Sequence, residues 1–174
     1  MKKKTLLLLL LFSSLFSQEY PPPTDLINVP TAGTLLRGSF SMGMRIQDEG
    51  GLIFGLSTGI TDRFQFGMSY GSPNFIGDDS LKWYPRPEAT LKYRIVDENM
   101  SIPALAIGLN TQGFGNYYHG DILDRYETKA LGSYAVVSKN WQSPLGNLGF
   151  HMGGNYNFLE INDGDDDINL FLGF

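Results

Sequence analysis

The sequence predicts an all-β fold, an antiparallel up-and-down transmembrane β-barrel of about eight strands in meander order. Three observations predict it: large apolar residues recur at every second position, mainly Gly, Ser and Gln lie between them, and the chain holds 21 glycines and 13% aromatic residues. A period of two is the spacing of a strand. A strand with small and polar residues on its second face cannot build a soluble core from that face, but it can line a barrel whose outside is lipid.

The pattern is clearest in residues 52–71, where two alternations flank a tight Thr61-Asp62 turn. The large residues that share one face are Leu52, Phe54, Leu56, Ile60, Phe64, Phe66, Met68 and Tyr70. Ile53 is the only large apolar residue on the opposite face. We therefore expect the large residues to face lipid and the small ones to face a lumen.

The first 17 residues have the pattern of a secretory signal peptide, with cleavage expected after Ser17. A positive head at residues 2–4 precedes an apolar run at residues 6–12 and a group of serines. The run is too short to span a bilayer as a helix, which disfavours the alternative of an uncleaved anchor. The chain has no cysteine, so a lipid-anchored cysteine and disulfide bonds are excluded.

Residues 18–37 are expected to form a periplasmic N-terminal segment, and residues 38–174 the barrel. Removing residues 1–17 leaves ten basic against 18 acidic residues, so the formal charge falls from −5 to −8. A nucleic-acid partner is therefore not expected, because no basic face remains to bind phosphates. The mean hydropathy of −0.13 is typical of soluble proteins and of membrane barrels alike, since only alternate barrel residues need be apolar.

Eight candidate strands follow in order along the chain. They are residues 38–47, 52–60, 64–71, 88–95, 103–110, 131–141, 148–158 and 168–174. The facing of 131–141 stays unassigned, because Tyr134 and Val136 compete with Ala135 and Val137. Residues 112–129 are expected to form a loop with one helical turn near Ile122. Short connections alternate with longer polar ones, which is typical of periplasmic turns and extracellular loops.

Charged residues of both signs fall at inward positions of these strands. The predicted lumen charge cluster consists of Arg45, Arg63, Glu88, Lys92 and Arg94. Eight strands enclose little more than side chains, so a barrel closed at eight should be plugged, with no open pore. An aromatic belt is expected from Trp83 and Tyr84 near the outer interface and Trp141 near the inner one.

Motifs that could carry catalysis are weak. Residues 55–59 and 67–71 both match G-x-S-x-G, but a nucleophile elbow needs a turn from strand to helix, and both serines are predicted in mid-strand. His119, near Asp121 and Asp124, is the candidate for a lipid-modifying site at the rim. The acidic loop Asp163–Asp167, together with Asn162 and Glu160, offers oxygen ligands for calcium, and a solvated acidic loop without a metal is the alternative; both stay open. No catalytic residue, metal or cofactor is predicted.

Three runs of residues carry a family resemblance. They are Asn28-Val29-Pro30-Thr31-Ala32-Gly33, Leu36-Arg37-Gly38-Ser39-Phe40 and Gly59-Ile60-Thr61-Asp62-Arg63. They resemble the opening of bacterial outer-membrane barrel proteins, loosely of the YjbH-like, exopolysaccharide-associated sort, over about the first half of the mature chain. The resemblance implies an outer-membrane location and a role in envelope or polysaccharide export. Such proteins are generally longer, so a complete small barrel and an N-terminal fragment are both open.

The last residues alternate up to Phe174, which resembles the signal that the barrel assembly machinery reads. We therefore expect a non-enzymatic outer-membrane barrel with a structural, adhesive or export-associated role. Its expected partners are outer-membrane lipid and that machinery, and an envelope or polysaccharide partner stays unidentified. The alternatives are a lipid-modifying enzyme using His119 and a soluble secreted barrel, in which Phe66 and Met68 would line a cavity for an apolar ligand.

Overall fold

The computed structural model describes residues 22–77, 80–120, 124–143, 146–160 and 167–174. Strands dominate this part of the chain, and its one helical element is the 3-10 turn η2, Asp48–Gly50. No helix among these residues is long and apolar enough to cross a membrane. Three predicted features lie outside the described residues: the signal peptide, Asp121, and the acidic loop up to residue 166.

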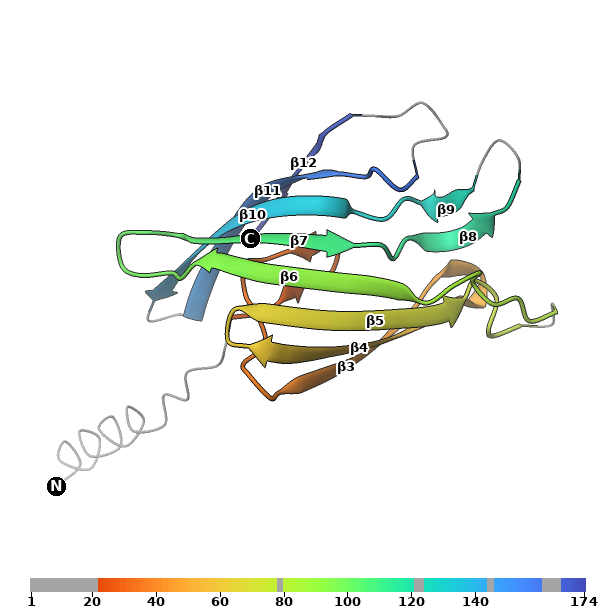
Figure 1. Ribbon diagram of the computed structural model, residues 1–174, viewed down its shortest axis with the longest axis horizontal. Helices are drawn as coiled ribbons and strands as arrows, with labels where there is room; N and C mark the ends of the chain where they lie inside the picture. The colour runs from red at the N-terminus through yellow and green to blue at the C-terminus, as the bar shows by residue number, and fades with distance from the viewer. Residues whose placement is uncertain (1–21, 78–79, 121–123, 144–145, 161–166) are drawn as a thin grey trace, which may run out of the picture.

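Eight strands form one antiparallel sheet in which each strand pairs with the strands next to it in the meander (Figure 1). They are β3 (Phe40–Ile46), β4 (Leu52–Thr61), β5 (Phe64–Ser72), β6 (Glu88–Val96), β7 (Ala104–Asn110), β10 (Gly132–Ser143), β11 (Gly146–Tyr156) and β12 (Asn169–Gly173). Each overlaps one predicted strand. The predicted all-β antiparallel meander of eight strands is thereby confirmed.

Two small hairpins lie outside the large sheet. The first joins β1 (Asp25–Leu26) to β2 (Val29–Pro30), in the segment that precedes the sheet. The second joins β8 (Phe114–Tyr118) to β9 (Arg125–Thr128). The second hairpin corrects the expectation that residues 112–129 form a loop. Its strands are held by ring packing, since Tyr126 of β9 lies 4.9 Å from the ring of Tyr117.

The connections divide between the two ends of the sheet. The β4–β5, β6–β7 and β10–β11 turns lie at one end, and the longer loops lie with the β8–β9 hairpin at the other (Figure 1). The β3–β4 connection shares the long-loop end but is short. It makes its turn at Gly50, whose φ is +77° and whose absent side chain leaves room for the carbonyl oxygen of Ile76.

The large apolar side chains of the sheet face outward and are exposed. They include Phe40, Met42, Met44, Phe54, Leu56, Met68, Tyr93, Ile107, Leu148, Phe150, Met152, Leu170 and Leu172. The ladders place them side by side, as in the pairs Phe54 with Tyr70 and Leu56 with Met68. The outer face is therefore a continuous apolar surface.

The core is small and lies on the opposite, inward face. Ala104, Ala106, Tyr134 and Val136 form its largest cluster, together with Ala32 from the segment before the sheet. The facing of β10 is thus assigned: Tyr134, Val136 and Ser138 point inward, while Ala135 and Val137 point outward.

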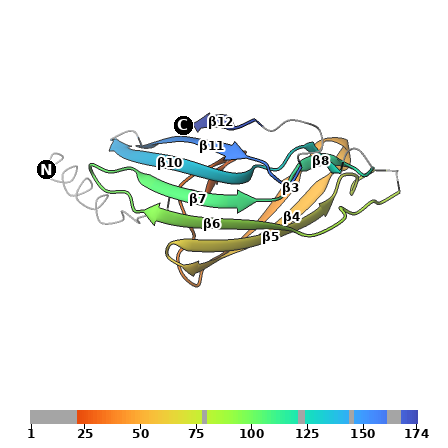
Figure 2. The same cartoon turned by 45° about the horizontal axis from the view of Figure 1, so that its top comes forward.

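Strands β3 and β12 are the two edges of the sheet, and no ladder joins them within the described residues. The sheet is curled, and the segment containing β1 and β2 crosses its concave side (Figures 1 and 2). Residues Pro30 to Thr34 of this segment are buried. Residues 18–37 are predicted to be a periplasmic segment. The part from residue 22 packs against the concave side of the sheet, and its location in the periplasm stays a prediction.

Candidate functional site: the polar inner face

The inner face of the sheet buries polar side chains, which is unusual for a sheet's covered face. Gln65, Glu88, Lys92, Ser138 and His151 are each at most 3% exposed. They share this face because they occupy alternate strand positions, and the ladders pair Gln65 with Lys92 and Ser138 with His151. Buried polar groups are costly unless they find hydrogen-bond partners, so the identity of those partners defines the site.

The partners of Lys92 come from the N-terminal segment. Its Nζ atom donates to the carbonyl oxygen of Thr24 at 2.5 Å and lies 3.4 Å from a carboxylate oxygen of Asp25. Lys92 is 1% exposed, whereas 54% of the Asp25 side chain is exposed. The segment therefore supplies the counter-charge of a cation at the middle of the sheet.

Two further inward side chains bind backbone groups of the same segment. The backbone N–H of Ala32 donates to Ser138 Oγ at 2.8 Å, and Ser138 Oγ lies 2.7 Å from His151 Nδ1. The backbone N–H of Leu35 donates to Gln65 Oε1 at 3.1 Å. Contacts from β5, β6 and β10 thus hold one stretch of chain along the inner face.

The β1–β2 hairpin touches both edge strands. Leu26 and Val29 lie against Gly173 of β12, where an added Cβ would stand 3.3 and 3.1 Å from their side-chain carbons. Arg45 of β3 donates to the side-chain oxygen of Asn28 in the hairpin turn. The hairpin accordingly bridges the concave side between β3 and β12.

Glu88 belongs to a second polar group at the long-loop end. Its carboxylate pairs with Arg86 at 3.1 Å and accepts hydrogen bonds from the hydroxyls of Tyr126 and Thr111, at 3.1 and 2.5 Å. Burial and the adjacent Glu88 carboxylate raise the pKa of Tyr126, so its hydroxyl stays protonated and donates. This group ties the β8–β9 hairpin to the start of β6.

Arg63 and Arg94 belong to a third group, at the short-turn end. Asp97 forms an ion pair with each of them, at 2.9 Å to Arg94 Nε, and Arg94 also donates to the backbone oxygen of Asp62. Arg63 was predicted to face inward, but it lies in the β4–β5 turn with 51% of its side chain exposed. The five predicted lumen charges therefore do not form one cluster. The N-terminal segment holds Lys92 and Arg45, Arg86 pairs with Glu88, and Asp97 pairs with Arg63 and Arg94.

Of the three residues predicted to form an aromatic belt, the two tryptophans are exposed and Tyr84 is buried; the location of the tryptophans at membrane interfaces stays a prediction. Trp83 and Trp141 are 50% and 49% exposed, near opposite ends of the sheet. Tyr84 is instead 2% exposed; its hydroxyl donates to the carbonyl oxygen of Gly115, and its ring lies 5.0 Å from that of Tyr126. Neighbours on an extended chain point in opposite directions, so Tyr84 turns inward where Trp83 turns outward.

Glu160, which the sequence indicates only as a possible calcium ligand, is a buried carboxylate with a structural role. It accepts the backbone N–H groups of Tyr126 and Ala130, each at 2.8 Å, and the side-chain N–H of Asn157 at 2.5 Å. It follows the end of β11 and holds the chain between β9 and β10. The only sequence signal is an Asn-x-x-Glu spacing directly after a strand, which is too common to identify such a role.

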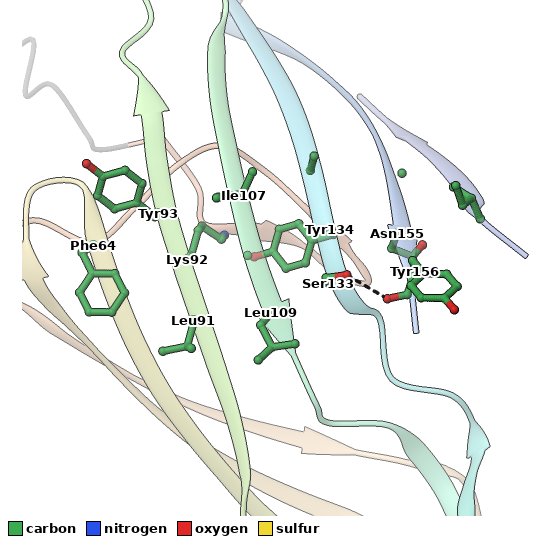
Figure 3. A pocket seen from close by; sticks show the side chains of 14 residues that line it. Phe64, Leu91, Lys92, Tyr93, Ile107, Leu109, Ser133, Tyr134, Asn155 and Tyr156 are labelled. Atoms are coloured by element: carbon green, nitrogen blue, oxygen red, sulfur yellow. Dashed lines mark hydrogen bonds between the residues drawn. The ribbon is translucent and has the colours of Figure 1, made fainter. Parts of the chain in front are cut away.

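The outer face carries a hollow of about 630 Å³ over β5, β6, β7, β10 and β11 (Figure 3). Its lining is mainly apolar and includes Phe64, Leu91, Tyr93, Leu109 and Tyr156, which are labelled in Figure 3. The small paired residues Ala135 and Gly154 also line it. The hollow therefore belongs to the apolar outer surface of the sheet.

Among the residues that the structure describes, the candidate catalytic serines and His119 lie on different elements of the fold. The serines of the two G-x-S-x-G matches lie within β4 and β5, and Ser69 donates to the side-chain oxygen of Gln112 at 2.8 Å. His119 Nδ1 lies 2.8 Å from Asp124, and 80% of the His119 side chain is exposed. The hydrogen bond from His119 lowers the pKa of Asp124. Within the described residues no group of three or more His, Cys, Asp or Glu side chains could hold a metal ion.

Comparison of the chain with protein-family models, with curated proteins and with solved structures finds no match.

Proposed function

We propose that the chain is a non-enzymatic outer-membrane β-barrel protein with a structural, adhesive or export-associated role in the cell envelope. One observation carries the proposal: the sheet exposes its large apolar side chains and buries its polar ones. Met42, Leu56 and Met68 are 77%, 55% and 50% exposed, whereas Lys92 and Glu88 are 1% and 3% exposed. A soluble monomer rarely exposes so continuous an apolar surface, whereas the outer face of a membrane barrel is apolar because it contacts lipid.

Loop asymmetry and the length of five of the eight strands support the same proposal. A tilted membrane strand needs roughly 9 to 11 residues; β4, β5, β6, β10 and β11 have 10, 9, 9, 12 and 11, whereas β3, β7 and β12 have 7, 7 and 5. Short turns at one end and long loops at the other are typical of outer-membrane barrels. In a bilayer the unpaired backbone groups of β3 and β12 need partners, and in an even-numbered meander these two edges run antiparallel and can pair.

The facing of the sheet disfavours the soluble ligand-binding alternative, which requires Met68 and its neighbours to line an interior cavity. The rim-enzyme alternative has one observation in its favour, the contact between His119 and Asp124 that could orient a catalytic histidine. We expect neither the wild type nor His119→Ala to catalyse lipid hydrolysis or acyl transfer. Either activity in the wild type, lost in His119→Ala, would favour the enzyme.

The proposal is tested by placing a charge on the apolar face. We expect Leu56→Arg to destabilise the membrane-inserted protein by about 2–4 kcal/mol, the cost of an arginine facing lipid near the bilayer midplane. Leu81→Arg is the matched control, because Leu81 is 49% exposed against 55% for Leu56 but lies in a loop. Urea titration of the heat-dependent electrophoretic shift measures both. Equal tolerance of the two variants, with the wild type in the soluble fraction, would contradict a membrane location.

A further inference from the structure

We propose that residues 22–37 are a plug that closes an aqueous path along the polar face of the sheet, and that displacing this plug opens the path to anions. The inference rests on the proposed membrane location of the sheet. It adds a second function, a closed conduit that the chain's own N-terminal segment keeps shut.

The plug is attached to the wall at several separate points. Besides the contacts of Lys92, Ser138 and Gln65, the hydroxyl of Thr34 donates to the backbone oxygen of Asp62 at 2.8 Å, and the backbone N–H of Arg37 donates to the Asp62 carboxylate at 3.0 Å. Thr31, Ala32 and Thr34 are 0%, 1% and 2% exposed. The segment is therefore packed as part of the interior and does not lie loosely over an opening.

The width of the concave side follows from what it contains. A closed eight-stranded barrel has room for little more than side chains. Here the concave side contains the backbone of the plug, including the β1–β2 hairpin, as well as the inward side chains (Figure 2). Removing the plug would therefore leave a gap lined by Gln65, Lys92, Ser138 and His151, which are polar and would be hydrated.

The charges left behind favour anions. Lys92 would lose Asp25, and Arg45 would lose Asn28. Glu88 stays paired with Arg86, and Asp97 with Arg63 and Arg94. The Asp62 carboxylate loses only a neutral donor, the backbone N–H of Arg37. Cationic side chains lining a pore select for anions.

The hairpin is the part of the plug from which displacement would begin. Its strands are two residues long, and its turn holds Ile27 at a φ of +51°, a conformation that is costly for a β-branched residue. Ile27 is also 91% exposed, so no packing compensates the cost.

The test ejects the plug without altering the wall. Ala32→Glu places an unpaired charge between Ala104, Ala106 and Val136, whereas Leu36→Glu makes a similar change at a plug residue that is 53% exposed. In planar bilayers we expect no conductance steps from the wild type or from Leu36→Glu. We expect steps from Ala32→Glu, with a reversal potential in a salt gradient that shows anion preference. Insertion is checked beforehand by the heat-dependent electrophoretic shift, whose absence would count against the proposed function and not against the plug.

A second measurement follows the plug directly. The chain has no cysteine, so Thr34→Cys supplies a single thiol at a buried plug position. We expect a water-soluble maleimide to label it about tenfold or more faster when Ala32→Glu is also present, because a buried unpaired charge shifts the plug toward its open position. Unchanged labelling would overturn the plug as a displaceable element. Faster labelling without conductance, or equal conductance in the wild type, would overturn the closed conduit.

Discussion

The ammonium group of Lys92 lies 3.4 Å from the carboxylate of Asp25, and the two residues differ sharply in burial, at 1% and 54% exposed. Lys92 lies on β6, in the middle of the sheet, and Asp25 lies on β1, in the segment that crosses the concave side of the sheet. The buried member of the pair is the cation, so the energetic consequence of breaking the pair depends on which residue is removed.

We expect Asp25→Asn to destabilise the protein more than Lys92→Met does. The first change leaves a buried ammonium without its counter-charge and with neutral acceptors only, at a cost of about 1–3 kcal/mol. The second leaves a carboxylate that is already half hydrated. Urea unfolding of the two variants, followed by the heat-dependent electrophoretic shift, measures the difference. The double variant is the control and should resemble Lys92→Met, and an equal loss in both single variants would contradict the assignment.

Gly108 leaves room for the ring of Tyr134 on the neighbouring strand. An added Cβ would run into the ring carbons and hydroxyl of Tyr134. We expect Gly108→Ala to cost about 1–3 kcal/mol of stability, the usual effect of overpacking a core. Gly43→Ala is the matched control, because a Cβ on Gly43 of β3 meets nothing within 4 Å. Thermal unfolding of the two variants side by side decides the matter, and equal melting temperatures would refute the contact.

Glu160 is expected to protect two backbone amides from hydrogen exchange. Its carboxylate accepts the N–H groups of Tyr126 and Ala130. We expect Glu160→Gln to speed exchange at both amides, because glutamine accepts through one oxygen only and its NH₂ group would face a donor. Glu127→Gln, at an exposed position of β9, is the control. Exchange rates that change no more in Glu160→Gln than in this control would show that Glu160 does not hold the segment.

Tyr84 makes stability depend on alkaline pH. It lies in the loop before β6, outside the proposed membrane strands, and burial raises its pKa from the ordinary 10.0 to about 12. The folded protein therefore keeps this proton while the unfolded chain releases it, so the contribution of Tyr84 is fully present below pH 10.0 and is lost as pH rises to about 12. Tyr84→Phe should flatten the fall of unfolding free energy across this window. Parallel curves for wild type and variant would contradict the prediction.

The sequence by itself determined the eight strands of the large sheet and the side of that sheet on which most of their residues lie. Phe54, Leu56 and Met68 share one face because side chains alternate along any strand, whatever surrounds it. The same local rule placed Glu88 and Lys92 on the opposite face. In β10 the alternation allows either face to be the apolar one, and the pairing with neighbouring strands decides between them: Tyr134 lies opposite Gly108, and Ser138 lies opposite His151.

Only the tertiary structure decided what fills the polar side. Ala32 and Ser138 are 106 positions apart, and Asp25 and Lys92 are 67 apart, so no local period relates them. Arg63 is held in a turn by Asp97, and Tyr84 is drawn inward by Tyr126, again through residues distant in sequence. Alternation is a property of each strand's own backbone, whereas the contacts that place the N-terminal segment exist only after the sheet has curled around it.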